Sequence, residues 1–215
     1  MKKVLFLITI SLLSCKGEKN CPKGINLLPM YGEVKKCKQQ IDFDKEFILE
    51  SEKQFGNKTK ASNFYVSKAW EYFHKNDNQT SMKRFNQAWL LDKTNPETYW
   101  GFGNLLGRKG DYKKSLKYFQ KSIEIEPNNP KVYESISTSY GQIFFNTKEM
   151  KYLNLTIENL KKSLEIEPNN GKAYAQLANA YSYFMQKDSL RKYIKKTDKI
   201  NPKLINPEIR KIANQ

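Results

Sequence analysis

The sequence predicts an all-α protein in which antiparallel helical hairpins stack into a superhelical solenoid behind one extra N-terminal helix. This prediction rests on an internal repeat. Residues 122–129 recur as 163–170 with seven of eight positions identical. Prolines end successive copies 34 residues apart, or 41 apart where a seven-residue insertion intervenes. Of the 215 residues, 39% are hydrophobic and 28% are charged, with 13 Tyr and 12 Phe. That composition is typical of a folded helical protein rather than of a disordered chain.

The first residues have the pattern of a secretory signal, with two lysines after the initial methionine and then a ten-residue apolar run at 4–13. Ten residues are too few for a helix to cross a bilayer. The run ends in Leu-Leu-Ser-Cys at 12–15, which resembles the lipobox of bacterial lipoproteins, with Leu13 where a smaller residue is commoner. The resemblance implies that 1–14 is a signal peptide and that Cys15 is lipidated and becomes the new N-terminus. The other interpretation is an ordinary thiol beside a signal peptide. We therefore expect a membrane-anchored lipoprotein of the bacterial cell envelope, and favour the outer membrane.

Two further cysteines, Cys21 and Cys37, are expected to form a disulfide, because an even pair is free to oxidise outside the reducing cytosol. The bridge would close a loop of roughly 15 residues and stabilise the fold by up to ~3 kcal/mol in the chain-entropy model. A metal site is disfavoured, since the two thiols are sixteen positions apart and the only histidine is His74. Residues 15–36 are interpreted as a tether, and 37–60 as a helix that caps the first repeat. Its apolar candidates are Ile41, Phe43, Phe47 and Ile48.

The repeat has a definite register when it is counted back from Pro127. In that frame one copy carries Tyr99, Phe102, Gly103, Leu106, Ser115, Phe119, Ser122 and Pro127. This pattern resembles the tetratricopeptide repeat, whose 34 positions alternate large apolar or aromatic residues with small ones and end near a proline. Leu106 is the one departure, because the family usually has an aromatic residue there. The resemblance implies a pair of antiparallel helices in each repeat, joined in this copy by a tight turn at Gly110.

Four repeat units follow in one frame. They are residues 62–95, 96–129, 130–170 and 171–204. The first unit departs from the pattern at Lys68 and Lys93, where an apolar residue and a proline are expected. In the third unit, the insertion around 145–151 is expected either to form a loop or to extend a helix. Residues 205–215 are expected to form a short helix and tail that leave the C-terminal end partly open.

The resemblance implies a concave groove lined by the first helix of each hairpin. Aromatic side chains with Arg and Asn suit an extended peptide or loop, because rings supply contact area and amides satisfy a peptide backbone. The residues implied for the groove are Trp70, Phe73, His74, Trp100, Asn104, Arg108, Glu134, Thr138, Gln142, Lys172, Asn179 and Tyr183. Trp70 and Trp100 could equally pack between helices as ordinary core. The family's carboxylate clamp is not predicted, because only Asn104 and Lys172 match its five positions.

The formal net charge is +16, and the basic excess is greatest in residues 191–215. Nucleic acid is disfavoured as a partner, because the chain is expected to be exported and has no recognition motif. Anionic lipid head groups, an acidic protein partner and a solvated basic face all remain open for this region.

No enzymatic activity, metal or cofactor is expected. His74 is the only histidine, and the sequence has no glycine-rich phosphate loop and no cluster of metal-ligating residues. The expected function is a protein–protein interaction module, an adaptor or assembly factor whose groove holds a peptide or loop of another envelope protein. The alternative is an envelope lipoprotein that captures a glycan or a peptidoglycan fragment on Trp70 and Trp100.

Overall fold

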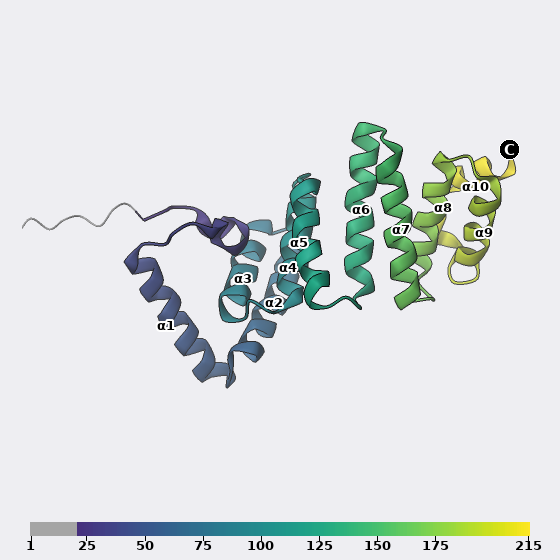
Figure 1. The fold of residues 1–215 in the computed structure, drawn as a ribbon. Coiled ribbons are helices and arrows are strands. Elements are labelled where there is room, and N and C mark those ends of the chain that lie inside the picture. Colours follow the sequence, from purple (N-terminus) through teal and green to yellow (C-terminus); the bar gives the residue numbers. More distant parts are fainter. Residues whose placement is uncertain (1–20) are drawn as a thin grey trace, which may run out of the picture.

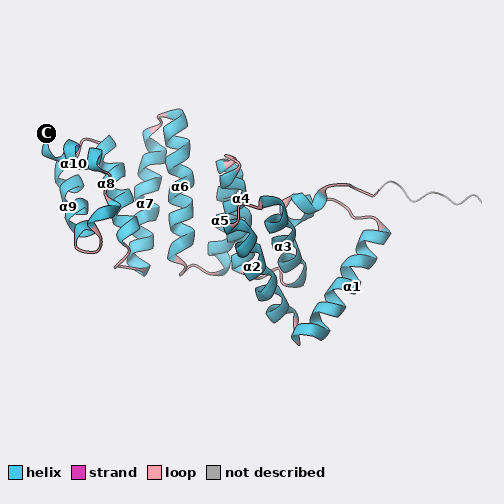
Figure 2. Ribbon diagram, turned by 180° about the vertical axis from the view of Figure 1, so that it is seen from behind, coloured by secondary structure: helices cyan, strands magenta, loops and turns pink. Residues whose placement is uncertain are grey.

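The computed structural model describes residues 21–215. Within that range the chain forms ten α-helices, three short 3-10 helices and no strand (Figure 1), and Figure 2 shows the same arrangement from behind. The all-α fold class is therefore confirmed. The expected signal peptide at 1–14, Cys15 and the start of the expected tether lie outside the described residues.

Four antiparallel hairpins stand side by side in an elongated row, in the order of the sequence (Figure 1). The hairpins are α2 (Lys58–His74) with α3 (Asn78–Leu91), α4 (Pro96–Arg108) with α5 (Tyr112–Ile125), α6 (Pro130–Thr147) with α7 (Met150–Ile166), and α8 (Gly171–Tyr183) with α9 (Lys187–Asp198). Helix α1 (Lys38–Phe55) precedes them, and α10 (Pro207–Asn214) follows. The 3-10 helices are η1 (Ile25–Leu27), η2 (Pro29–Glu33) and η3 (Pro202–Leu204).

Asparagines begin the first helix of each of the last three hairpins. The side-chain oxygens of Asn95, Asn129 and Asn170 accept hydrogen bonds from backbone N–H groups in the first turn. Asp77 and Asp111 do the same for the second helices α3 and α5. Each cap satisfies a donor that has no partner inside its helix, so the polar residues between the apolar runs define where the helices begin.

Two glycines let neighbouring helices approach closely. Phe85 and Phe119 are buried, and their rings lie against Gly101 and Gly103 of α4. A Cβ atom at either glycine would overlap the facing ring, so larger residues do not fit without movement. Gly103, one of the small residues of the repeat pattern, thus leaves room for an aromatic ring from the next helix.

The described part of the expected tether is folded, which corrects that interpretation. Helices η1 and η2 pack on α3, where the buried Asn86 holds them. The Asn86 Nδ2 donates to the carbonyl oxygens of Asn26 (2.9 Å) and Leu28 (2.8 Å), and its Oδ1 accepts from the Tyr31 backbone N–H (3.2 Å). Met30 is buried beside it. A disulfide joins Cys21 to Cys37, with 5.2 Å between the Cα atoms, and so fastens this segment to the start of α1.

Helix α1 differs from the expected cap in length and in packing. It ends at Phe55, because Gly56 has a left-handed backbone (φ 85°), and Asn57 then caps α2. Residues 58–60 therefore belong to the first repeat. Only the C-terminal half of α1 packs closely, with the Phe55 ring 4.7 Å from Phe64 between centroids. Two of the apolar residues expected to pack, Ile41 and Phe43, are exposed by 41% and 60%.

The insertion in the third unit extends both helices of its hairpin rather than forming a long loop. Helix α6 has 18 residues and α7 has 17, against 13 in α4 and 14 in α5. The turn between α6 and α7 is short, and Lys148 takes a left-handed conformation there (φ 59°). The α6–α7 hairpin consequently projects beyond its neighbours at this edge of the row (Figure 1).

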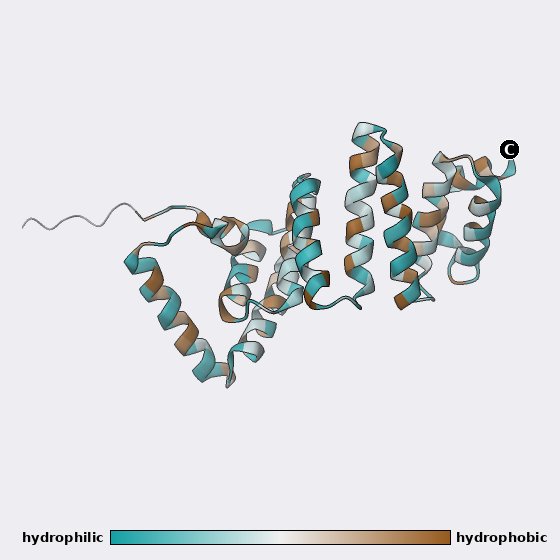
Figure 3. Ribbon diagram, in the orientation of Figure 1, coloured by the Kyte–Doolittle hydropathy of each residue, from teal (hydrophilic) through white to brown (hydrophobic). Residues whose placement is uncertain are grey.

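The C-terminal residues cover the last hairpin. Ile205 and Ala213 are buried against α8 and α9. The Arg210 guanidinium donates two hydrogen bonds to Asp198, of 3.0 and 2.5 Å, which hold α10 to the end of α9. None of the helices in residues 21–215 is both long and apolar enough to cross a bilayer, and Figure 3 shows hydrophilic residues interspersed along them.

Candidate functional site

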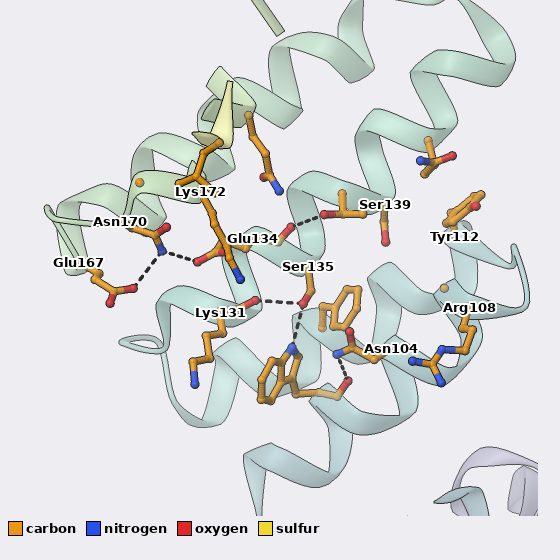
Figure 4. A pocket seen from close by; sticks show the side chains of 18 of the residues that line it. Asn104, Arg108, Tyr112, Lys131, Glu134, Ser135, Ser139, Glu167, Asn170 and Lys172 are labelled. Atoms are coloured by element: carbon orange, nitrogen blue, oxygen red, sulfur yellow. Dashed lines mark hydrogen bonds between the residues drawn. The ribbon is translucent and has the colours of Figure 1, made fainter. Parts of the chain in front are cut away.

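A groove of about 1020 Å³ runs along α4, α6 and the start of α8, and η3 borders its far end (Figure 4). Eight of the twelve residues predicted for the groove line it. They are Phe73, Trp100, Asn104, Arg108, Glu134, Thr138, Gln142 and Lys172. The first helices of the hairpins thus supply most of its wall, and the repeat register brings these side chains to one face.

Trp70 and His74 do not line this groove, contrary to the prediction. The Trp70 ring is half-buried, with its centroid 5.2 Å from Phe85 and 4.5 Å from Trp100. Its Nε1 donates to a Glu97 carboxylate oxygen at 3.1 Å. His74 is exposed at the end of α2 and stacks on Trp70 at 6.2 Å. Trp70 is therefore core between two hairpins, which is one of the two interpretations that its helical spacing allowed.

The other two predicted residues, Asn179 and Tyr183, line a smaller cavity of about 330 Å³ beside the groove. This cavity lies between α6, α7 and α8. Thr138, Gln142 and Gln176 border both spaces, so the two are adjacent.

Several groove residues carry a weaker sequence signal or none. Lys131 is the second residue of its repeat unit, as the predicted Lys172 is of the next, so its signal is present in the sequence. Ser135 directly follows the predicted Glu134, and Gln176 holds the corresponding place in the fourth unit. Glu167 and Asn170 come from the turn between α7 and α8, where a helix-based rule gives no signal.

The acidic side chains of the groove are held by neighbours (Figure 4). Glu134 accepts a hydrogen bond from Asn170 Nδ2 at 2.6 Å and one from Ser163 Oγ at 3.5 Å. The same Nδ2 donates to Glu167 at 2.9 Å. Lys131 and Lys172, by contrast, form no ion pair with any residue of 21–215. Together with Arg108, these lysines give the groove lining three cationic groups against the two carboxylates of Glu134 and Glu167.

Three predicted groove residues also stiffen its wall. The Trp100 Nε1 donates to Ser135 Oγ at 2.9 Å, and Asn104 Nδ2 donates to the Trp100 carbonyl at 2.8 Å. Arg108 donates to the Phe73 carbonyl at 2.7 Å, and its guanidinium carbon lies 3.5 Å from the centre of the Phe73 ring. These polar groups therefore already have hydrogen-bond partners inside the fold. Arg108 binds the carbonyl of Phe73 in the last turn of α2.

The asparagines that cap the first helices also join successive hairpins, and we call Asn95, Asn129 and Asn170 the bridging asparagines. While Oδ1 caps its own helix, Nδ2 donates to the preceding hairpin. Asn95 reaches Asn63 at 2.9 Å, Asn129 reaches Glu97 at 3.4 Å, and Asn170 reaches Glu134 at 2.6 Å. One side chain therefore sets both where a helix begins and how the hairpins are spaced.

Glu97 is more than half buried at the second of these bridges. Burial raises the pKa of the Glu97 carboxyl above its ordinary value, and the hydrogen bond from Trp70 opposes that shift. Within residues 21–215, no three His, Cys, Asp or Glu side chains gather in a way that could hold a metal ion. The chemistry that the groove offers is binding through ammonium, amide and ring groups.

The stacked hairpins and the shared groove define a helical-repeat protein. Residues 96–129 and 159–196 each match a model of the tetratricopeptide repeat. These two segments are therefore tetratricopeptide repeats, and the hairpins around them share the same fold. No curated protein matches it in sequence.

Solved structures share this fold. The chain is 19% identical to MamA over 77% of its own length and 92% of that chain, with a TM-score of 0.57. It is 15% identical to TTC0263, a thermophilic repeat protein of Thermus thermophilus, over 71% of this chain and 79% of the other, with a TM-score of 0.58. The first repeat domain of Spaghetti (RPAP3), bound to the HSP90 peptide SRMEEVD, is 15% identical over 59% of this chain and 94% of that one, with a TM-score of 0.52.

Proposed function

We propose that this protein is a membrane-anchored interaction module of the bacterial envelope, and that its groove holds a peptide or loop of another envelope protein. One observation carries the proposal. Lys131 and Lys172 line the groove without an ion pair in residues 21–215, and with Arg108 they outnumber its two carboxylates, Glu134 and Glu167. An acidic segment would complement this excess of positive charge.

The dimensions and chemistry of the groove favour a peptide over a compact small molecule. It extends over three hairpins, and its lining combines uncharged polar side chains with rings, which suit a peptide backbone and its side chains. The structure of the Spaghetti (RPAP3) repeats bound to an HSP90 peptide is an example of such an occupant in a stack of the same fold. The groove therefore supports an adaptor or assembly role.

Capture of a glycan fragment gains less support. It requires exposed ring faces, but Trp70 is half-buried between hairpins and its Nε1 is bonded to Glu97. Of these two rings, Trp100 alone reaches the groove, and its Nε1 is bonded to Ser135.

The anchor rests on the lipobox-like sequence at 12–15. We expect Cys15→Ala to move the protein from the membrane fraction to the soluble fraction of lysed cells. The wild-type protein should sediment with membranes and be released by detergent. Sedimentation of the variant with membranes would contradict anchoring through Cys15.

A photoreactive amino acid at Gln142 tests the groove in native membranes. We expect it to crosslink a specific envelope protein, whereas the same group at Lys117, on the outer helix α5, should not. The yield should fall when Lys131→Glu and Lys172→Glu are added, but not when Lys113→Glu and Lys117→Glu are added as a charge-matched control in a Gln142-labelled protein. Equal yields in the two doubly substituted proteins would refute binding through the groove lysines.

A further inference from the structure

The smaller cavity beside the groove is a product of the insertion in the third repeat. Helix α6 continues for five residues beyond the length of α4, and Phe144 and Phe145 lie in this extension. Tyr183, at the end of α8, faces it, with its ring centroid 5.3 Å from that of Phe144. A repeat of ordinary length would end α6 near Gln142 and would not form this wall.

The lining of this cavity is apolar on one side and amide-bearing on the other. Phe145 and Tyr183 are exposed by 59% and 51%, which is unusual for two rings that border one cavity. The floor is made by small or buried groups, including Gly141 and Ala180. The hydroxyl of Thr156 is already bonded to the Tyr152 carbonyl at 2.9 Å, so the floor offers no open polar group from this residue.

Unpaired amides stand where the cavity meets the groove. The side chains of Gln142, Gln176 and Asn179 form no hydrogen bonds within the part of the chain that the structure describes. A side-chain amide can both donate to and accept from an extended peptide backbone. A peptide lying in the groove would thus have backbone partners at the point where one of its side chains enters the cavity.

We infer that this cavity, which we call the aromatic pocket, receives one bulky apolar side chain of an extended acidic peptide held in the groove. The inference rests on the proposed function. Charge complementarity at Lys131 and Lys172 specifies the acidic part of the peptide, and the rings of Phe145 and Tyr183 specify the apolar part. A volume of about 330 Å³ accommodates a phenylalanine or leucine side chain.

Selection from a random twelve-residue phage-displayed peptide library tests the inference. We expect the purified protein, residues 21–215 with the disulfide intact, to enrich peptides that combine acidic residues with one Phe, Leu, Trp or Met at a fixed spacing. Enriched peptides would then be synthesised with a fluorescent label, and their Kd measured by anisotropy.

Two variants address the pocket itself. Phe145→Ser removes part of the pocket wall. Gly141→Leu fills the pocket instead, and a Cβ atom at Gly141 fits without a clash, because its nearest neighbours are atoms of Thr156 at 3.8 and 3.9 Å. Each should weaken binding of the apolar-containing peptide by roughly tenfold. Each should leave a peptide with Ala at that position unaffected. Phe43→Ser is the matched control, since Phe43 is a ring of similar exposure on α1.

The outcomes separate this inference from the proposed function. Enrichment of acidic peptides without an apolar position would overturn the aromatic pocket but leave the groove assignment standing. No enrichment of any peptide would count against both. Dimerisation that Phe145→Ser abolishes in light scattering would assign the exposed rings to a second copy of the chain and overturn the inference.

Discussion

The strongest test of the fold concerns Asn170, because this one side chain caps α8 and bridges to the preceding hairpin. Its Oδ1 accepts from the Ala173 N–H at 3.0 Å, and loss of such a cap costs about 1 kcal/mol. Its Nδ2 donates to Glu134 at 2.6 Å and to Glu167 at 2.9 Å. Bonds to charged acceptors contribute roughly 1.5–3 kcal/mol when buried, and the exposure of Glu167 reduces the pair to about 2 kcal/mol. We therefore expect Asn170→Ala to lower the free energy of unfolding by about 3 kcal/mol.

Asn170→Ser separates the two contributions, because serine is a good cap but is too short to bridge. Asn170→Ser should lower the free energy of unfolding by only about 2 kcal/mol, which is the contribution of the two bonds that Nδ2 donates. The assay is urea unfolding followed by far-UV circular dichroism, with Asn128→Ala as the control, since Asn128 is exposed and should change stability by less than about 0.5 kcal/mol. If Asn170→Ser proved as stable as the wild type, the bridge would contribute nothing and the reasoning would be refuted.

The same substitution should also affect binding. Without Asn170 Nδ2, the Glu134 carboxylate loses its closest partner and becomes available to the groove lysines. Peptide affinity should then fall in Asn170→Ser even at temperatures where the variant is fully folded. An unchanged Kd for the selected acidic peptides would show that Glu134 does not compete with them.

Three further predictions concern other parts of the fold. Reduction of the disulfide between Cys21 and Cys37 should lower stability by roughly 2–3 kcal/mol, measured by urea unfolding with and without dithiothreitol; no change would contradict its structural role. Gly103→Ala should destabilise by about 1–2 kcal/mol, because its Cβ would overlap a buried phenylalanine ring, whereas Gly107→Ala, with its nearest contact at 4.0 Å, should be neutral or slightly stabilising in thermal melts. Because the folded-state pKa of Glu97 is raised, its contribution to stability is full below the unfolded pKa and is lost as pH rises through the folded pKa. Glu97→Gln should therefore gain stability relative to the wild type as the pH rises above the ordinary Glu pKa of 4.5, and parallel pH profiles would disprove this.

The parts of the fold that depend on local pattern could be predicted from the sequence. The order of the hairpins follows from the repeat pattern. Residues of the same type as Gly103 and Pro127 mark corresponding places in successive units, so each unit predicts one hairpin. The same register brings Trp100, Glu134 and Lys172 to one groove. Lys131 obeys it too, at a position that the sequence prediction did not use.

Contacts between distant residues could not be read in this way. The expected tether contains prolines and glycines, which indicate irregular chain, and the reason for its order is Asn86, about 60 residues away. Trp70 has the spacing of either a groove or a core residue, and the choice depends on the adjacent Trp100. The insertion is compatible with a loop or a helix, and the contact of Phe144 with Tyr183 favours the helix.

The order of residues 25–33 limits the distance between a membrane and the N-terminal end of the stack. If Cys15 carries the lipid, only five residues separate it from Cys21, where the disulfide-bonded segment begins. Even fully extended, that stretch spans roughly 20 Å. The N-terminal end of the stack would then stay close to the bilayer, and the row of hairpins itself would set how far the groove lies from it (Figure 1). Partners would have to present their acidic segment at that fixed distance from the membrane, so location would contribute to selection alongside peptide sequence.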